Sequence, residues 1–290
     1  MAKKILIALI IGLILSGGFG LYRALKYSQS SQQPPKELKA PEITIRLIEG
    51  WTNKEIASYL EKEGIVPAED FLKAIKNFNP IGYESFLPKK AKADLQGFLY
   101  PDTYRLFESL KDRSQNTPQA AAEQIITKLL KNFQAKLPEA AESLAKKQGL
   151  DLYEAVTLAS IIEKETGRNS VTDAQRQGLD EERKIIAGIF YNRLAISMAL
   201  QSDATVNYIT GKSDPGISEA DAKMDSPYNT YQRVGLTPTP ICNPSLSSIL
   251  ASLNPTKTDY LYFLHDQKTG KAIYAKTYEE HLQNKQKYLR

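Results

Sequence analysis

An apolar run near the N-terminus, residues 5–22 (ILIALIIGLILSGGFGLY), restricts most strongly how this chain can fold. Eighteen helical residues rise about 27 Å, just enough to cross the hydrocarbon core of a bilayer. The alternative is a cleaved signal peptide with SGGFG as its small-residue exit. Because no A-x-A site is present and the run continues past Gly20, we expect an uncleaved anchor, residues 1–27, with the large domain outside the cytoplasmic membrane.

The charge of the chain supports this division. The net charge is +5, but the first 26 residues contain four bases and no acid, which leaves 34 bases against 33 acids in the rest of the 290 residues. A nucleic-acid-binding domain usually has a basic surplus in its folded part. We therefore expect no nucleic-acid partner.

The few reactive side chains exclude several enzyme classes. With one cysteine, Cys242, the chain cannot form an internal disulfide, and two histidines with that thiol cannot make a His/Cys zinc cluster. No G-x-S-x-G elbow is present. We expect neither a metal nor a cofactor.

Residues 28–41 and 42–93 differ sharply in composition. The first segment is a polar, proline-bearing tether. The second predicts a strand with Ile43 and Ile45 facing inward, a helix capped by Thr52 with Glu55 three residues on, and another helix from about Asp70. This order resembles a LysM-like module, a fold often used to bind N-acetylglucosamine polymers. A generic small α+β subdomain is the alternative.

Residues 94–290 predict a larger α+β domain. An aromatic, β-prone stretch around a P-D turn is followed by helical patterns, and a strand hairpin precedes the last helix, which Thr277 and Glu280 begin. The expected helices span residues 117–133, 138–149, 151–167 and 185–194. The fold class we predict is α+β: an N-terminal transmembrane helix, a small LysM-like subdomain and a larger α+β catalytic domain.

The helix over residues 151–167 ends in LASIIEKETG, which contains Glu163 and Glu165. At 100° per residue, Glu165 lies about 60° from Ile162, at the edge of the predicted apolar stripe, and Glu163 lies about 100° away on the other side. The two carboxyl groups therefore cannot converge on one bond. Apolar neighbours and the negative end of the helix dipole both favour a protonated Glu165, as a general acid requires. The alternative is a solvated helix-end glutamate paired with Arg168.

The E-T-G sequence is similar to the E-S-G that ends the catalytic helix of lysozyme-like lytic transglycosylases. Eight stretches also resemble, in order, the endolytic murein transglycosylase (YceG-like) family: LQGFLYPDTYRL, LASIIEKETG, IFYNRL, MALQSDATVNY, SPYNTY, GLTPTPICNPSL, LNPTKTDYLYF and KTYEEH. They lie within residues 94–281. The chain departs from the family pattern at Gln96, where Glu is frequent, at Thr237 and Thr239, where Pro and Gly are usual, and at Ser245, where Gly is common.

The resemblance implies non-hydrolytic cleavage of the β-1,4 bond between N-acetylmuramic acid and N-acetylglucosamine in bacterial peptidoglycan, which ends growing strands in 1,6-anhydro sugars. It implies Glu165 as the single acid and base, where glycosidases use two carboxyl groups. It also implies an association with peptidoglycan synthases. Expected sugar-binding residues are Glu163, Asn192, Gln201, Asp203, Tyr228, Asn229, Thr230 and Tyr231.

Other roles remain open for these residues and for the chain. Ser202 and Asn207 could instead belong to a turn that caps the next helix, and Asn192 could be a buried hydrogen-bonding residue. Asp203 could act as a second carboxylate, which would favour a muramidase-type hydrolase. A non-catalytic, anchored cell-wall-binding or division scaffold is the third alternative.

Overall fold

The structure is a computed structural model of the chain, and it describes residues 18, 22, 23, 26, 40–84, 86–87, 94–166, 173–212 and 216–289. Contacts divide the chain into two compact units, Met1–Pro41 and Glu42–Arg290. The predicted anchor and tether lie almost entirely outside the described residues. Among the residues that are described, no helix is both long and apolar enough to cross a membrane.

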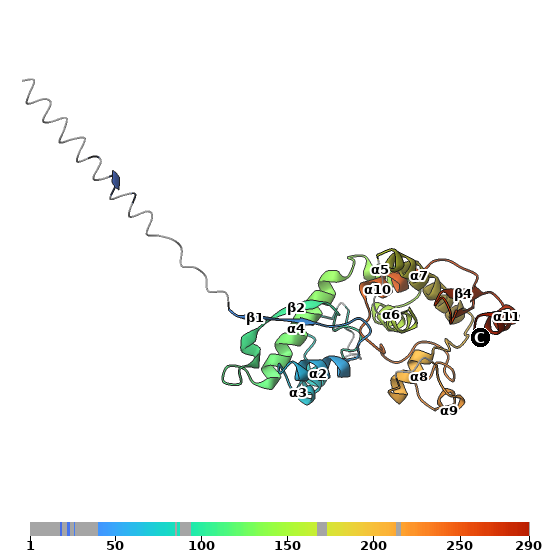
Figure 1. Cartoon of the computed structure of the whole chain (residues 1–290), viewed down its shortest axis with the longest axis horizontal. Coiled ribbons are helices and arrows are strands. Elements are labelled where there is room, and N and C mark those ends of the chain that lie inside the picture. Colours follow the sequence, from blue (N-terminus) through green and yellow to red (C-terminus); the bar gives the residue numbers. More distant parts are fainter. Residues whose placement is uncertain are drawn as a thin grey trace, which may run out of the picture. The chain divides into compact units, whose positions relative to one another are not determined.

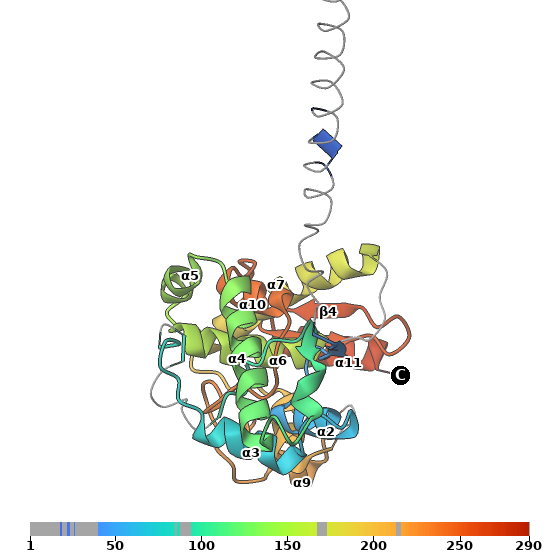
Figure 2. The same cartoon turned by 90° about the vertical axis from the view of Figure 1, so that its left-hand side faces the viewer.

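The second unit begins with a strand, two helices and a second strand. These are β1 (Glu42–Arg46), α2 (Asn53–Lys62), α3 (Ala68–Asn77) and β2 (Thr103–Phe107). The strands pair antiparallel, with Ile43 opposite Leu106 and Ile45 opposite Tyr104, so one face of the ribbon is apolar. This pairing joins residues on both sides of the predicted division at residues 93/94. Helix α3 packs on the long helix α4 (Pro118–Lys136), as Figures 1 and 2 show.

The remaining elements surround α6 (Leu152–Thr166). They are η2 (Glu108–Lys111), α5 (Ala141–Lys147), α7 (Asp173–Ala195), α8 (Asp203–Thr210), α9 (Glu219–Ala222), α10 (Leu246–Leu253), the antiparallel hairpin β3 (Tyr262–His265) and β4 (Ala272–Ala275), and α11 (Tyr278–Tyr288). Together with the first strands and helices they make the unit α+β, as predicted.

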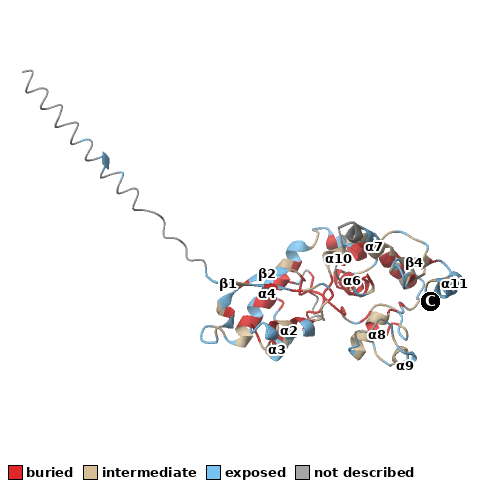
Figure 3. Cartoon of the chain, viewed as in Figure 1, coloured by how far each residue is buried: buried red, intermediate tan, exposed pale blue. Residues whose placement is uncertain are grey.

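Helix α6 lies between two hydrophobic clusters. Val156 and Ala159 belong to the cluster built with the N-terminal strands and α4, whereas Leu158 and Ile161 belong to the cluster built with α7. Twelve of the fifteen residues of α6 are buried (Figure 3), so the prediction of a single apolar stripe was wrong. Elements α5, α7, α8 and α10 all contact α6, and this packing fixes the position of its C-terminal end.

Asn243 joins the first part of the unit to the second. Its Oδ1 accepts hydrogen bonds from the backbone of Gly97 and Leu99, and its Nδ2 donates to the Trp51 carbonyl and to Oδ1 of Asn53. The side chain is completely buried with all four of these bonds made. The loop that precedes α10 is thereby attached to the start of α2.

Candidate active site

Glu165 lies in the last turn of α6 with its side chain half-buried. The hydroxyl of Ser202 donates a hydrogen bond of 2.5 Å to its Oε1. Ser202 occupies the N-cap position of α8, where a serine hydroxyl usually accepts from the helix backbone, but here it makes no such capping bond. Ser202 therefore stands at the N-cap position, as the turn prediction had it, but the Ser202 hydroxyl bonds to the carboxyl group of Glu165 and not to the backbone of α8.

The surroundings of Glu165 favour its protonated form. Burial raises the pKa of the Glu165 carboxyl above its usual range, and the negative charge of Asp203 raises it further. The Ser202 hydrogen bond and the positive charge of Arg193, together with that of His265 when it is protonated, act in the opposite direction but do not cancel the rise. A raised carboxyl pKa favours the protonated form, which is the form that a general acid needs.

Asp203 follows Ser202 in the chain and is held by a tyrosine. The hydroxyl of Tyr231 donates to Oδ1 of Asp203 at 2.5 Å. We call Glu165, Ser202, Asp203 and Tyr231 the Glu165 cluster. Gln201, just before it, is exposed and adopts a left-handed backbone with φ of 49°, a conformation that is rare outside glycine and that costs about 1–3 kcal/mol.

The other expected sugar-binding residues make hydrogen bonds within the protein. Asn192 donates to the carbonyls of Thr258 and Tyr260, and Asn229 donates to those of Ala222 and Met224. The Thr230 hydroxyl accepts from the Ser202 backbone N–H and contacts the hydroxyl of Thr205, and the Tyr228 hydroxyl contacts that of Thr239. The bonds of Thr230 stabilise the loop that carries Ser202.

Glu163 faces a different element from Glu165. Its Oε2 accepts from the Ser245 backbone N–H at 2.9 Å, from the Ser245 hydroxyl at 2.5 Å and from the Ser248 hydroxyl at 2.7 Å. Arg183 lies 3.9 Å from its Oε1, and the Glu163 side chain is 4% exposed. A carboxylate at the N-terminus of α10 is favoured by the helix dipole, so Glu163 holds α6 and α10 together.

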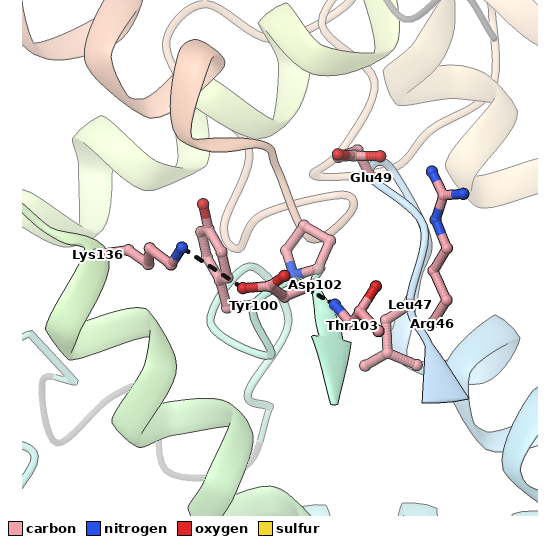
Figure 4. A pocket seen from close by; sticks show the side chains of 8 residues that line it. Arg46, Leu47, Glu49, Tyr100, Asp102, Thr103 and Lys136 are labelled. Atoms are coloured by element: carbon pink, nitrogen blue, oxygen red, sulfur yellow. Dashed lines mark hydrogen bonds and ion pairs between the residues drawn. The ribbon is translucent and has the colours of Figure 1, made fainter. Parts of the chain in front are cut away.

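A polar pocket of about 260 Å³ lies elsewhere, where β1 ends and β2 begins (Figure 4). Its lining includes Arg46, Glu49 and Tyr100, and an ion pair of 3.6 Å joins Asp102 to Lys136. None of the Glu165 cluster lines this pocket. Within the described ranges, no group of three or more His, Cys, Asp or Glu side chains could hold a metal ion.

The sequence profile of the YceG-like family matches residues 16–287, which is nearly the whole chain. The chain belongs to the YceG-like family.

Relatives and a solved structure agree with this membership. An endolytic murein transglycosylase of Bacillus subtilis is 36% identical over 234 residues, 80% of this chain and 59% of that protein. One from Streptococcus pneumoniae is 34% identical over 295 residues, which cover 91% of this chain and 49% of that protein. The chain therefore spans about half to three-fifths of the length of these relatives. A crystal structure of a yceG-like protein from Listeria monocytogenes is 36% identical with a TM-score of 0.67, covering 84% of this chain and 76% of that one.

In this YceG-like chain, two basic residues that act on Glu165 had not been expected at the site. Arg193 is the next-to-last residue of the apolar stretch IIAGIFYNRL, and His265 ends the strand β3. An arginine within this apolar stretch indicated a buried polar role, but no local pattern indicated which carboxyl group it approaches. His265 also contacts Glu182 on α7, with 3.0 Å between Nε2 and Oε1.

Proposed function

We propose that this chain is a peptidoglycan lytic transglycosylase that cleaves the β-1,4 bond between N-acetylmuramic acid and N-acetylglucosamine inside glycan strands. The observation that carries the proposal is a single half-buried carboxyl group, Glu165, with a raised pKa and an orienting hydrogen bond from Ser202. The names of the relatives support the same chemistry.

In the proposed reaction Glu165 acts twice. As an acid it gives its proton to the glycosidic oxygen while the bond from C1 of N-acetylmuramic acid to that oxygen breaks. As a carboxylate it then accepts the proton of the 6-hydroxyl of the same sugar while that oxygen bonds to C1. The 1,6-anhydro ring closes, no water is consumed, and Glu165 ends in its starting protonation state.

Ser202 and Asp203 adjust the two halves of this cycle. The Ser202 hydroxyl donates to Glu165, so it orients the carboxyl group and stabilises its charged form. The charge of Asp203 has the opposite effect, because a nearby negative charge disfavours the Glu165 carboxylate and so favours the protonated carboxyl group. Tyr231 fixes Asp203 at 2.5 Å and adds an aromatic ring suited to packing on a sugar.

A muramidase-type hydrolase is the second candidate, and the nearness of Asp203 to Glu165 favours it. In that reaction Asp203 would stabilise the oxocarbenium ion or activate water, and reducing ends would form. We favour the transglycosylase because Asp203 follows Ser202 directly and accepts the Tyr231 hydroxyl, which is a suitable arrangement for an electrostatic role.

The proposal extends to the rest of the chain. The apolar N-terminal run would anchor the enzyme in the cytoplasmic membrane with the catalytic domain outside. The order β1–α2–α3–β2 with an antiparallel ribbon supports a LysM-like subdomain that binds glycan. Cleavage close to the membrane would end growing strands and would suit an association with peptidoglycan synthases.

Product analysis tests the proposal. The full chain, Glu165→Gln and Asp203→Asn are each incubated with purified peptidoglycan, and the fragments are identified by mass spectrometry. We expect 1,6-anhydro ends from the full chain, none from Glu165→Gln, and fewer but chemically unchanged ends from Asp203→Asn. Reducing ends that disappear in Asp203→Asn would establish the hydrolase, and no fragments from the full chain would favour the scaffold.

A further inference from the structure

Arg193 lies in the last turn of α7, buried beside the Glu165 cluster. Two hydrogen bonds and one aromatic contact hold its side chain in place. Its Nη1 donates to the Leu200 carbonyl at 2.5 Å and its Nε donates to the Leu261 carbonyl at 2.6 Å. Its guanidinium carbon lies 5.5 Å from the centre of the Tyr262 ring. The residue is 5% exposed, so these contacts replace almost all of its hydration.

The partners of this guanidinium are carbonyl oxygens and an aromatic ring. No carboxylate in the described part of the chain forms an ion pair with Arg193, in contrast to Arg183 of the same helix, which pairs with Asp180 and Glu163. Among the carboxyl groups that the structure describes, the one whose charge acts on Arg193 is Glu165. A buried charge without a paired counter-ion is costly, and a structural arginine would usually have one.

Arg193 also reaches Glu165 through the backbone. The Leu200 carbonyl that it binds lies two residues before Ser202, whose hydroxyl donates to Glu165. The residue between them, Gln201, is the one with a left-handed backbone. Arg193 therefore holds the end of a strained three-residue segment that presents the hydroxyl to the carboxyl group.

We propose that Arg193 is a positioning residue for the reaction: it fixes the segment that presents Ser202, and its buried positive charge stabilises the Glu165 carboxylate that forms when the proton leaves. This inference rests on the proposed role of Glu165. In the cycle above, a general acid that is too weak cannot protonate the glycosidic oxygen, and Arg193 offsets part of the effect of burial and of Asp203.

The groups that face Glu165 come from four parts of the fold. Arg193 approaches from α7, Asp203 from α8, Tyr231 from the loop after α9 and His265 from β3. His265 carries charge only when it is protonated, and Glu182 lies 3.0 Å from it. Arg193 is thus the one permanent cation among the described groups that act on Glu165.

The test compares three substitutions in the full chain. Arg193→Gln and Arg193→Met remove the charge, and Met also keeps the packing beside Tyr262 if Gln does not fold. Arg193→Lys keeps the charge with fewer hydrogen bonds. Each protein is titrated by NMR of carboxyl carbons in 13C-labelled glutamate, with Glu165→Gln used to assign the Glu165 signal, and the pH profile of glycan cleavage is recorded beside it.

We expect the neutral variants to move the Glu165 midpoint to higher pH by about one unit, and the alkaline limb of the cleavage profile to move with it. At the pH optimum kcat should fall about tenfold. Arg193→Lys should keep the midpoint near that of the unaltered chain while it lowers Tm. Arg183→Gln, the same change at a paired arginine of α7, should lower Tm without moving the Glu165 midpoint.

Two results would overturn the inference: an unmoved Glu165 midpoint in the folded neutral variants, or an equal shift in Arg193→Lys. The NMR titration needs no substrate. Failure of the proposed function, seen as an absence of glycan cleavage, is therefore distinguishable from failure of the coupling between Arg193 and Glu165.

Discussion

Glu163 and Glu165 lie on one helix, two residues apart, and have opposite environments. Glu163 accepts hydrogen bonds from Ser245, the N-cap of α10, and from Ser248 in its first turn, and these donors satisfy a charged carboxylate. Glu165 accepts one hydrogen bond, from the Ser202 hydroxyl, and faces Asp203. The pKa of its carboxyl group is raised chiefly by burial. The same chemical group is therefore placed once where its charged form is satisfied and once where its protonated form is favoured, as the proposed proton transfer requires.

Glu165→Gln should increase stability at neutral pH. Because the folded-state pKa of Glu165 is raised, the folded chain binds the proton more tightly than the unfolded chain, and stability falls as pH rises from about 4 through the folded pKa. Glutamine carries no titrating proton and avoids this loss. Thermal unfolding across pH should show a higher Tm for Glu165→Gln at neutral pH, and the difference should shrink toward pH 4. A gap that widens toward acid would contradict a raised pKa.

Glu163→Gln is the matched substitution and should act in the opposite direction on stability. An amide cannot replace a carboxylate that accepts three hydrogen bonds at a helix N-terminus, and Arg183 loses a partner. We expect a loss of about 2 kcal/mol in the free energy of unfolding, measured with urea, and weakened cleavage with unchanged products. Unaltered stability would show that these bonds are dispensable.

At the scale of elements, local signals predicted local structure. The capping boxes of Thr52 with Glu55 and Thr277 with Glu280 form as expected, and the predicted hairpin is β3 with β4. Helix α7 is much longer than predicted, since its first half is polar and shows no apolar period. Element bounds that depend on tertiary packing were therefore not predictable from periodicity.

Only part of the candidate site could be predicted, because the rest of it also depends on tertiary packing. Helix periodicity separated Glu163 from Glu165, and the structure agrees that they face different partners. Ser202 and Arg193, which both act on Glu165, belong to other elements of the chain. Their placement beside Glu165 depends on tertiary packing, which local sequence patterns do not predict. Ser245 is one of the departures from the family pattern. Its hydroxyl donates a hydrogen bond to Glu163, which a glycine at this position could not do.

Gly188→Ala tests how closely α7 packs. A Cβ at Gly188 would lie 2.2 Å from the Thr256 carbonyl oxygen, in the segment that ends with the carbonyls bound by Asn192. We expect a loss of about 2–3 kcal/mol in the free energy of unfolding. Gly178→Ala, in the same helix with nothing within 4 Å, should be neutral or slightly stabilising. Equal effects of the two changes would show that the contact at Thr256 is easily relieved.

At the scale of the second unit, Asn243 and the β1–β2 pairing connect the first strands and helices to the domain that holds Glu165. Gly97 adds to this connection, because a Cβ there would lie 2.6 Å from Pro240. Contacts of this kind favour cooperative unfolding of Glu42–Arg290 as one unit.

Asn243→Leu should separate these parts. The substitution leaves the Gly97 and Leu99 N–H groups without their acceptor, at a cost of at least about 3 kcal/mol. Trp51, the single tryptophan, reports on the first part by fluorescence, while circular dichroism reports on all helices. In urea the two signals should coincide for the unaltered chain and diverge for Asn243→Leu. Divergence already in the unaltered chain would mean that the parts unfold independently.

The most direct test of single-carboxyl catalysis is the fate of water during cleavage. The full chain is incubated with purified peptidoglycan in H2 18O. The new glycan ends are then treated with borohydride, and their masses are measured by mass spectrometry. We predict ends that are one water lighter than hydrolysed ends, that contain no 18O and that resist reduction. Reducible ends that carry 18O would contradict the mechanism and assign water, rather than the 6-hydroxyl, as the nucleophile.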